Sequence, residues 1–136
     1  MEPRWIRGRY DAAAAAVALR SAPVNVSPDG ECWIEIQVGE LDIEVWFPHE
    51  PGSSEAPSLD TAASVIAQLT AFDDVIQAEL EEASRVSVHE AKNFMFDLST
   101  IVMNNDREIT LSYIGSEVNS EFDVRFEHRD GAWHRV

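Results

Sequence analysis

Two alternating runs separated by two residues constrain the fold more than any other feature of the chain. Glu31–Val38 and Leu41–Phe47 each carry an apolar side chain at every second position, with Gly39-Glu40 between them. Alternation is typical of a strand with one buried face, and glycine first in a two-residue connection suits a tight hairpin turn. The register that follows gives one wholly apolar face, on which these residues pair: Val38 with Leu41, Ile36 with Ile43, and Ile34 with Val45.

The opposite face of this hairpin is unusual for a solvated surface. The same register places these outward residues opposite each other: Trp33 and Trp46, Glu35 and Glu44, Gln37 and Asp42. Like charges that face each other across a strand pair destabilise it by a few tenths to about 1 kcal/mol. Exposed indoles beside unpaired carboxylates are typical of a surface that binds a basic protein. The alternative is that an N-terminal helix covers the two indoles while Arg4, Arg7 and Arg9 neutralise the glutamates.

The last third of the chain predicts a second hairpin. Glu108–Ile114 and Val118–His128 alternate, and a two-residue loop at Gly115-Ser116 would pair Tyr113 with Val118 and Ile109 with Phe122. Asp130-Gly131 begins a further turn. Two outward carboxylates of the long run, Glu121 and Asp123, join the predicted binding residues.

Helical spacing predicts one long helix from Leu59 to about Arg85, whose apolar side would cover the sheet. Alanine-rich Arg9–Arg20 predicts an N-terminal helix that stops before Pro23. Residues 86–105 alternate loosely, as a strand does, and also fit a helical turn. The predicted fold class is α+β: an antiparallel sheet of four to six strands with one long helix packed on one face and an N-terminal helix.

Length and composition fit one globular domain. The 136 residues are 45% hydrophobic and 26% charged, so we expect a single domain over 1–136, with a helical segment at 1–24 and the α+β core at 25–136. Asp and Glu number 25 against 10 Lys and Arg, a formal net charge of −15. Such a charge disfavours nucleic acid and anionic membranes and favours a basic protein partner, although high solubility alone also explains it.

The sequence predicts no enzyme, cofactor or metal site. Cys32 is the only cysteine and falls on the apolar side of its strand, where thiols are usually inert packing. The four histidines lack metal-ligand spacing, and no phosphate-binding loop is present. A small hydrolase that uses outward carboxylates is a remote alternative.

The expected compartment is the cytoplasm, with the periplasm as the alternative. No run reaches the roughly 18 apolar residues of a membrane span. Arg4, Arg7 and Arg9 before an apolar run imitate a signal peptide, but Glu2 and Asp11 interrupt the pattern.

The C-terminal third carries a resemblance to known proteins. Tyr113-Ile-Gly-Ser-Glu-Val-Asn-Ser-Glu-Phe-Asp123, followed by an aromatic strand and Gly131-Ala-Trp133, resembles the ending of small acidic bacterial proteins. Their pattern is Y-x-G-x-x-V-N-[ST]-E-[FW]-D, then G-x-W, and some look like immunity proteins that act against secreted antibacterial toxins. Ser120 stands where threonine is more usual. The resemblance implies an immunity protein that binds and neutralises a cognate toxin; the alternative is an adaptor that binds a basic protein without inhibiting it.

Overall fold

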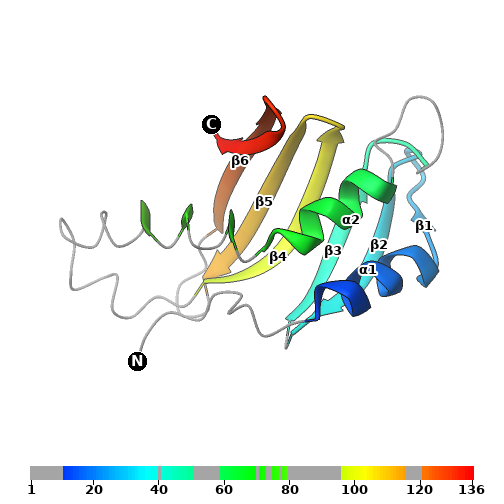
Figure 1. The fold of residues 1–136 in the computed structure, drawn as a ribbon. Helices are drawn as coiled ribbons and strands as arrows, with labels where there is room; N and C mark the ends of the chain where they lie inside the picture. The colour runs from blue at the N-terminus through cyan, green and yellow to red at the C-terminus, as the bar shows by residue number, and fades with distance from the viewer. Residues whose placement is uncertain are drawn as a thin grey trace.

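Seven strands form one sheet and lie in the sheet in chain order (Figure 1). The computed structural model describes residues 11–39, 41–50, 59–69, 71–72, 75–76, 78–79, 96–115 and 121–136. The strands are β1 (Asn25–Val26), β2 (Cys32–Val38), β3 (Leu41–Phe47), β4 (Phe96–Asn105), β5 (Glu108–Gly115), β6 (Glu121–Arg129) and β7 (Ala132–Arg135). Neighbouring strands are antiparallel, except that β3 and β4 are parallel. The expected sheet of four to six antiparallel strands was therefore wrong in both strand number and direction.

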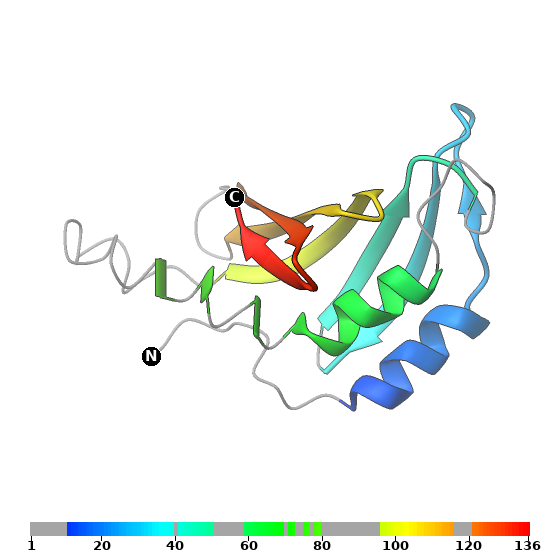
Figure 2. The same cartoon turned by 45° about the horizontal axis from the view of Figure 1, so that its top comes forward.

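Two short helices lie on the same face of the sheet, α1 (Ala12–Ser21) and α2 (Leu59–Ala67) (Figure 2). Asp11 caps α1, because its Oδ1 accepts a hydrogen bond from the Ala14 amide at 3.1 Å. The helix ends as expected before Pro23, with the Ala22 amide bonded to the Ala18 carbonyl at 2.9 Å.

The predicted unbroken helix from Leu59 to Arg85 is wrong, because α2 ends at Ala67. The described residues after Gln68, which are 69, 71–72, 75–76 and 78–79, are again helical. The Gln68 amide bonds three residues back to the Val65 carbonyl at 3.0 Å. In a continuing helix the Ser64 carbonyl would accept a hydrogen bond from the Gln68 backbone amide. Here it accepts one from the Gln68 side chain instead, with Nε2 at 3.2 Å. Residues 80–85 lie outside the described residues. The structure is mainly β, and within its described residues no long helix packs on a sheet face.

Apolar periodicity nevertheless identified which side chains of this segment are buried. Leu69, Phe72 and Ile76 are no more than 4% exposed and belong to the core. Periodicity reports the side of a segment that meets the core, whereas helix continuity depends on every backbone hydrogen bond. The two properties separate at Gln68.

One core fills the space between the sheet and the elements above it. Its sheet side includes Ile34, Val45 and Ile101, and its helix side includes Leu19 and Val65, all fully buried. A helix with an alanine-rich, narrow apolar stripe can approach a sheet closely, which explains why short α1 contributes to this core. Burial of such branched side chains stabilises the fold by about 1.5–3 kcal/mol each.

The register of the first hairpin is confirmed at every position. Val38 pairs with Leu41, and Gly39 has φ +60°, the left-handed conformation that the predicted turn requires. The turn at Asp130-Gly131 is also confirmed, since it joins the paired residues Arg129 and Ala132. Turn chemistry thus fixes both of these hairpins locally.

The register predicted for the second hairpin is wrong by four residues. Tyr113 pairs with Phe122, not Val118, and Ile109 pairs with Phe126. A shift by an even number leaves every side chain on its expected face, so the apolar pattern alone could not reject the shorter loop. Residues 116–120 lie outside the described residues.

The ambiguous segment contains a strand, β4, interrupted by a bulge. The register shifts between Leu98 and Thr100, so Ser99 is an additional residue on this strand. Leu98 and Ile101 are therefore both buried although they are three residues apart. Residues 86–95 lie outside the described part of the chain.

Candidate functional site

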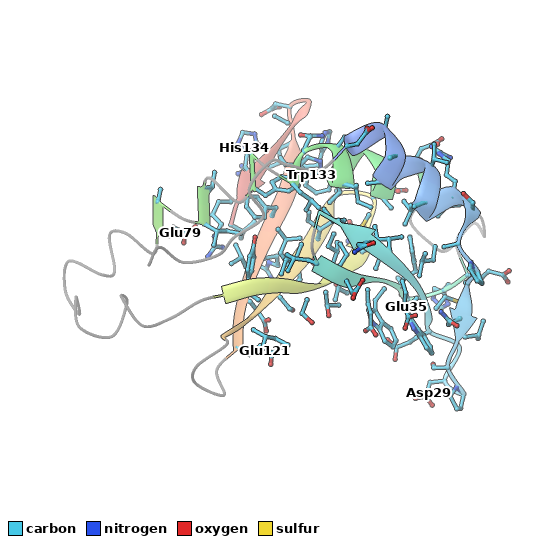
Figure 3. The ribbon with its side chains drawn as sticks, turned by 90° about the horizontal axis from the view of Figure 1, so that it is seen from below. Asp29, Glu35, Glu79, Glu121, Trp133 and His134 are labelled. Carbon is cyan, nitrogen blue, oxygen red and sulfur yellow. The ribbon has the colours of Figure 1, made fainter. Side chains whose placement is uncertain are left out.

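Two rows of side chains cross the sheet on the face opposite to α1 and α2. Strand register aligns the first, the aromatic row: Asn25, Trp33, Trp46, Val102, Thr110 and Arg125. Register also aligns the second, the carboxylate row: Glu35, Glu44, Thr100, Ser112 and Asp123. Figure 3 shows Glu35 and Glu121 projecting from the side of the sheet away from the helices. We call this surface the outer face.

The two tryptophans of the aromatic row stack on each other. Their ring centroids are 4.7 Å apart and their planes are inclined by 17°. The two-residue connection between Val38 and Leu41 makes Trp33 and Trp46 a pair without mutual backbone hydrogen bonds, in which side chains approach most closely. Each indole is half-buried. Strand geometry therefore presents a rigid apolar platform on the outer face.

Several carboxylates lie around this aromatic platform, and few described cations pair with them. Glu35 and Glu44 face each other one step along the strands from the tryptophans. Oε1 of Glu44 accepts a hydrogen bond from Trp46 Nε1 at 2.9 Å, whereas Glu35 is exposed and has no ion pair among the described residues. Register places further carboxylates on the outer face: Asp42, Glu108, Glu121, Asp123 and Glu127.

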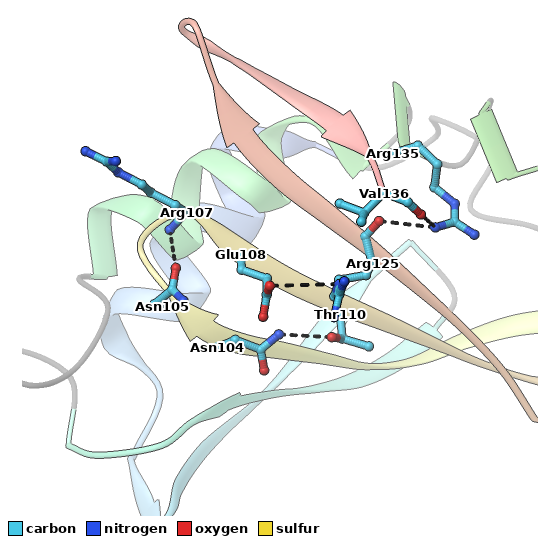
Figure 4. Close-up of polar contacts among 8 residues, drawn as sticks. All are labelled: Asn104, Asn105, Arg107, Glu108, Thr110, Arg125, Arg135 and Val136. Atoms are coloured by element: carbon cyan, nitrogen blue, oxygen red, sulfur yellow. Dashed lines mark hydrogen bonds and ion pairs between the residues drawn. The ribbon is translucent and has the colours of Figure 1, made fainter.

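Cations are scarce on this face within the described part of the chain. Register places Arg125 in the aromatic row and Arg129 near the last turn. Nε of Arg125 lies 3.8 Å from Oε1 of Glu108 (Figure 4), an exposed ion pair that contributes about 0–1 kcal/mol. Among the described residues, no cation therefore offsets the negative charge at Glu35 and Glu44.

All seven predicted binding residues lie on the outer face. Trp33, Glu35, Asp42, Glu44 and Trp46 come together on the first hairpin as expected. Glu121 and Asp123 lie on β6, three strands from β3, or about 14 Å at the usual strand spacing.

The residues between these two groups were missed by sequence analysis. Val102, Thr100, Thr110 and Ser112 are half-buried and form an uncharged band between the hairpin and β6. The bulge at Ser99 interrupts the apolar alternation of β4, so the outward residues of this strand could not be recognised from the sequence pattern.

The alternative in which the N-terminal helix covers the indoles is wrong for the described helix. Ala15 and Leu19 of α1 are buried in the core on the other side of the sheet. No described helix lies on the outer face (Figure 2). Arg4, Arg7 and Arg9 lie outside the described residues.

Cys32 belongs to the core and is poorly suited to nucleophilic chemistry. It is 1% exposed. Burial raises the pKa of its thiol above the ordinary value, and the Glu50 carboxylate raises it further. Because thiolate is the reactive form, this thiol is largely unreactive near neutral pH.

No site for a metal ion forms among the described side chains, in which no three His, Cys, Asp or Glu residues are suitably grouped. The ring of His128 contacts Trp133 with centroids 5.0 Å apart, and Nε2 of His134 lies 3.1 Å from the Arg129 carbonyl. Within the described residues, neither helix has the length and apolar character needed to cross a membrane.

Comparison with family models, with curated proteins and with solved structures finds no significant match. The geometry and charge of the outer face are therefore the basis for assigning a function.

Proposed function

We propose that this chain is a non-catalytic immunity protein that binds and neutralises a cognate antibacterial toxin in the cytoplasm. The outer face is the binding surface, and the toxin presents a basic surface to it. The observation that carries the proposal is the stacked Trp33–Trp46 pair beside Glu35 and Glu44, two facing carboxylates that no described cation pairs with.

The outer face combines a rigid aromatic anchor with negative charge that a basic partner can neutralise. Tryptophans that lose little conformational freedom on binding are common energetic centres of interfaces. Lysine or arginine side chains of the partner can lie over the indoles and reach the neighbouring carboxylates, since consecutive rows are about 7 Å apart along a strand. The partner then relieves the repulsion between Glu35 and Glu44 that the free protein bears.

Neutralisation of a nuclease suits this surface best. A nuclease groove is positive because it holds phosphates, and an acidic face can occupy it in place of nucleic acid. The resemblance of Tyr113–Asp123 to the ending of some immunity proteins supports the choice of a toxin as partner.

If the chain is an immunity protein, its gene is expected to lie directly downstream of the toxin gene, so the test uses the product of that neighbouring upstream gene as the ligand. A Glu35→Lys/Asp42→Lys/Glu44→Lys variant is expected to slow association at least tenfold and to flatten its salt dependence. The control, Glu50→Lys/Asp60→Lys/Asp106→Lys, has the same change in net charge at three other exposed sites. Because Asp60 pairs with Arg20 and Asp106 accepts a hydrogen bond from Thr61, urea unfolding of both variants accompanies the binding measurement. Equal association of both variants would overturn the outer face as the binding surface.

Inhibition is tested separately from binding. Co-expression with the neighbouring gene product is expected to restore growth, and the Glu35→Lys/Asp42→Lys/Glu44→Lys variant is expected to lose this protection. Tight binding without protection would assign the chain to adaptors instead.

A further inference from the structure

Within the described part of the chain, one edge of the sheet is open along most of β2. β1 pairs only with Cys32 and Trp33, so Ile34–Val38 has no strand neighbour on that side among the described residues. An open strand edge presents unpaired amides and carbonyls, which readily pair with another extended segment.

Two residues of β2 direct their backbone groups to this open edge. The Trp33 carbonyl points towards β1, where it accepts a hydrogen bond from Asn25 Nδ2 at 3.3 Å. Backbone groups alternate in direction along a strand, so Glu35 and Gln37 point the same way. The intervening Ile34 and Ile36 point towards β3, consistent with their pairing across the two-residue turn.

The borders of this edge differ on the two faces of the sheet. On the outer face lie the exposed Glu35 and Gln37, with Glu44 and Asp42 beyond them. On the other face α1 lies against β2. Exposed valines also belong to α1 and the segment around β1: Val17, Val24 and Val26, which are 64%, 41% and 62% exposed.

Charge selects the occupant of this edge. A second copy would bring two chains of net charge −15 together and place two acidic outer faces side by side, which repulsion disfavours. We infer that the open edge of β2 receives an extended segment of the basic partner as an added antiparallel strand, with lysine or arginine at alternate positions on the outer face and apolar residues between them. This inference rests on the proposed function, because it states how the partner meets the same face.

The test uses full-length protein and three capped peptides of alternating lysine and valine. One is unmodified, one is N-methylated at the lysines, and one is N-methylated at the valines. In the inferred register the lysines lie opposite Glu35 and Gln37, so lysine amides donate to β2 and valine amides point away. Binding is measured by NMR titration at low salt.

Methylation at the lysines is expected to weaken binding at least tenfold, because it removes main-chain hydrogen bonds. Methylation at the valines is expected to leave binding within threefold. The free protein is expected to exchange the Glu35 and Gln37 amides rapidly, and the unmodified peptide is expected to slow both.

Three results would overturn the inference: no binding of the unmodified peptide, equal effects of the two methylations, or self-association with slowed exchange at Glu35 and Gln37. The Glu35→Lys/Asp42→Lys/Glu44→Lys variant distinguishes this failure from failure of the proposed function. If both methylated peptides bind equally but charge reversal abolishes peptide binding, the strand-addition inference is rejected and the acidic outer face remains supported as the binding surface. If methylation at the lysines weakens peptide binding but charge reversal does not, strand addition at the β2 edge is supported and the acidic outer face is rejected as the binding surface.

Discussion

The indole nitrogen of Trp46 donates a hydrogen bond to Oε1 of Glu44, two residues away on the same strand, at 2.9 Å. This bond links the aromatic row to the carboxylate row and holds Glu44 towards the indole. Glu35, opposite Glu44, has no such bond within the described structure. Of these two facing carboxylates, Glu35 is therefore the more available to a partner's cation.

Replacing Glu35 with glutamine is expected to stabilise the free protein. The change removes a like-charge pair across β2 and β3, which should raise the free energy of unfolding by a few tenths to about 1 kcal/mol. Urea unfolding at low salt measures the effect, and high salt should reduce it. The reciprocal control, Gln37→Glu opposite Asp42, should destabilise the hairpin. A destabilising Glu35→Gln change would contradict a strained acidic face.

Truncation of the tryptophans is expected to affect binding more than folding. Trp33→Ala and Trp46→Ala remove half-buried rings whose stacking contributes about 0.5–1.5 kcal/mol beyond area burial. The same changes should weaken binding of the neighbouring gene product by tenfold or more. Calorimetric titration and denaturant unfolding give the two quantities.

The comparison variant for the tryptophans is Phe126→Ala, in the core on the other face. Phe126 is 1% exposed and packs on Phe72 with ring centroids 4.6 Å apart. Its truncation should destabilise the fold by about 3–5 kcal/mol. A similar loss of unfolding free energy in Trp33→Ala would show that the indoles belong to the core.

Arg135 and Glu79 connect β7 to the chain beyond α2 by a two-point contact. Nε of Arg135 donates to Oε2 of Glu79 at 2.8 Å, and a second guanidinium nitrogen donates to Oε1 at 3.2 Å. Both side chains are partly exposed, so solvent screening limits the expected coupling to about 1 kcal/mol. A double-mutant cycle with Arg135→Met and Glu79→Gln measures it. Strict additivity of the two changes would show that the contact does not stabilise the fold.

The raised pKa of Cys32 predicts the sign of one contribution to alkaline stability. The folded state binds the thiol proton more tightly than the unfolded state, whose pKa is about 8.5. This contribution is fully present below the unfolded pKa and is lost as pH rises through the folded pKa, by up to about 1.4 kcal/mol per pH unit. Denaturant unfolding between pH 7 and 10, compared with Cys32→Ala, isolates the effect. An identical pH slope in the two proteins would contradict it.

Sequence patterns succeeded where neighbouring residues determine the structure. Gly39 supplies the positive φ of the first hairpin, and the pairing of Trp33 with Trp46 and of Glu35 with Glu44 follows from that turn. The same reasoning failed for β5 and β6, because two registers that differ by four residues bury the same side chains. It also predicted one uninterrupted helix across Gln68, because apolar spacing carries no information on backbone hydrogen bonds.

The sequence by itself determined the two faces of β2, β3, β5 and β6 and the register of the first hairpin, since side-chain alternation and turn geometry act over a few residues. Only the tertiary structure decided that β4 lies parallel beside β3, a contact between segments about fifty residues apart. That pairing aligns Glu44 with Thr100 and, through Ser112, with Asp123. Local periodicity cannot specify which strands become neighbours, because that choice depends on how the whole chain buries its apolar surface.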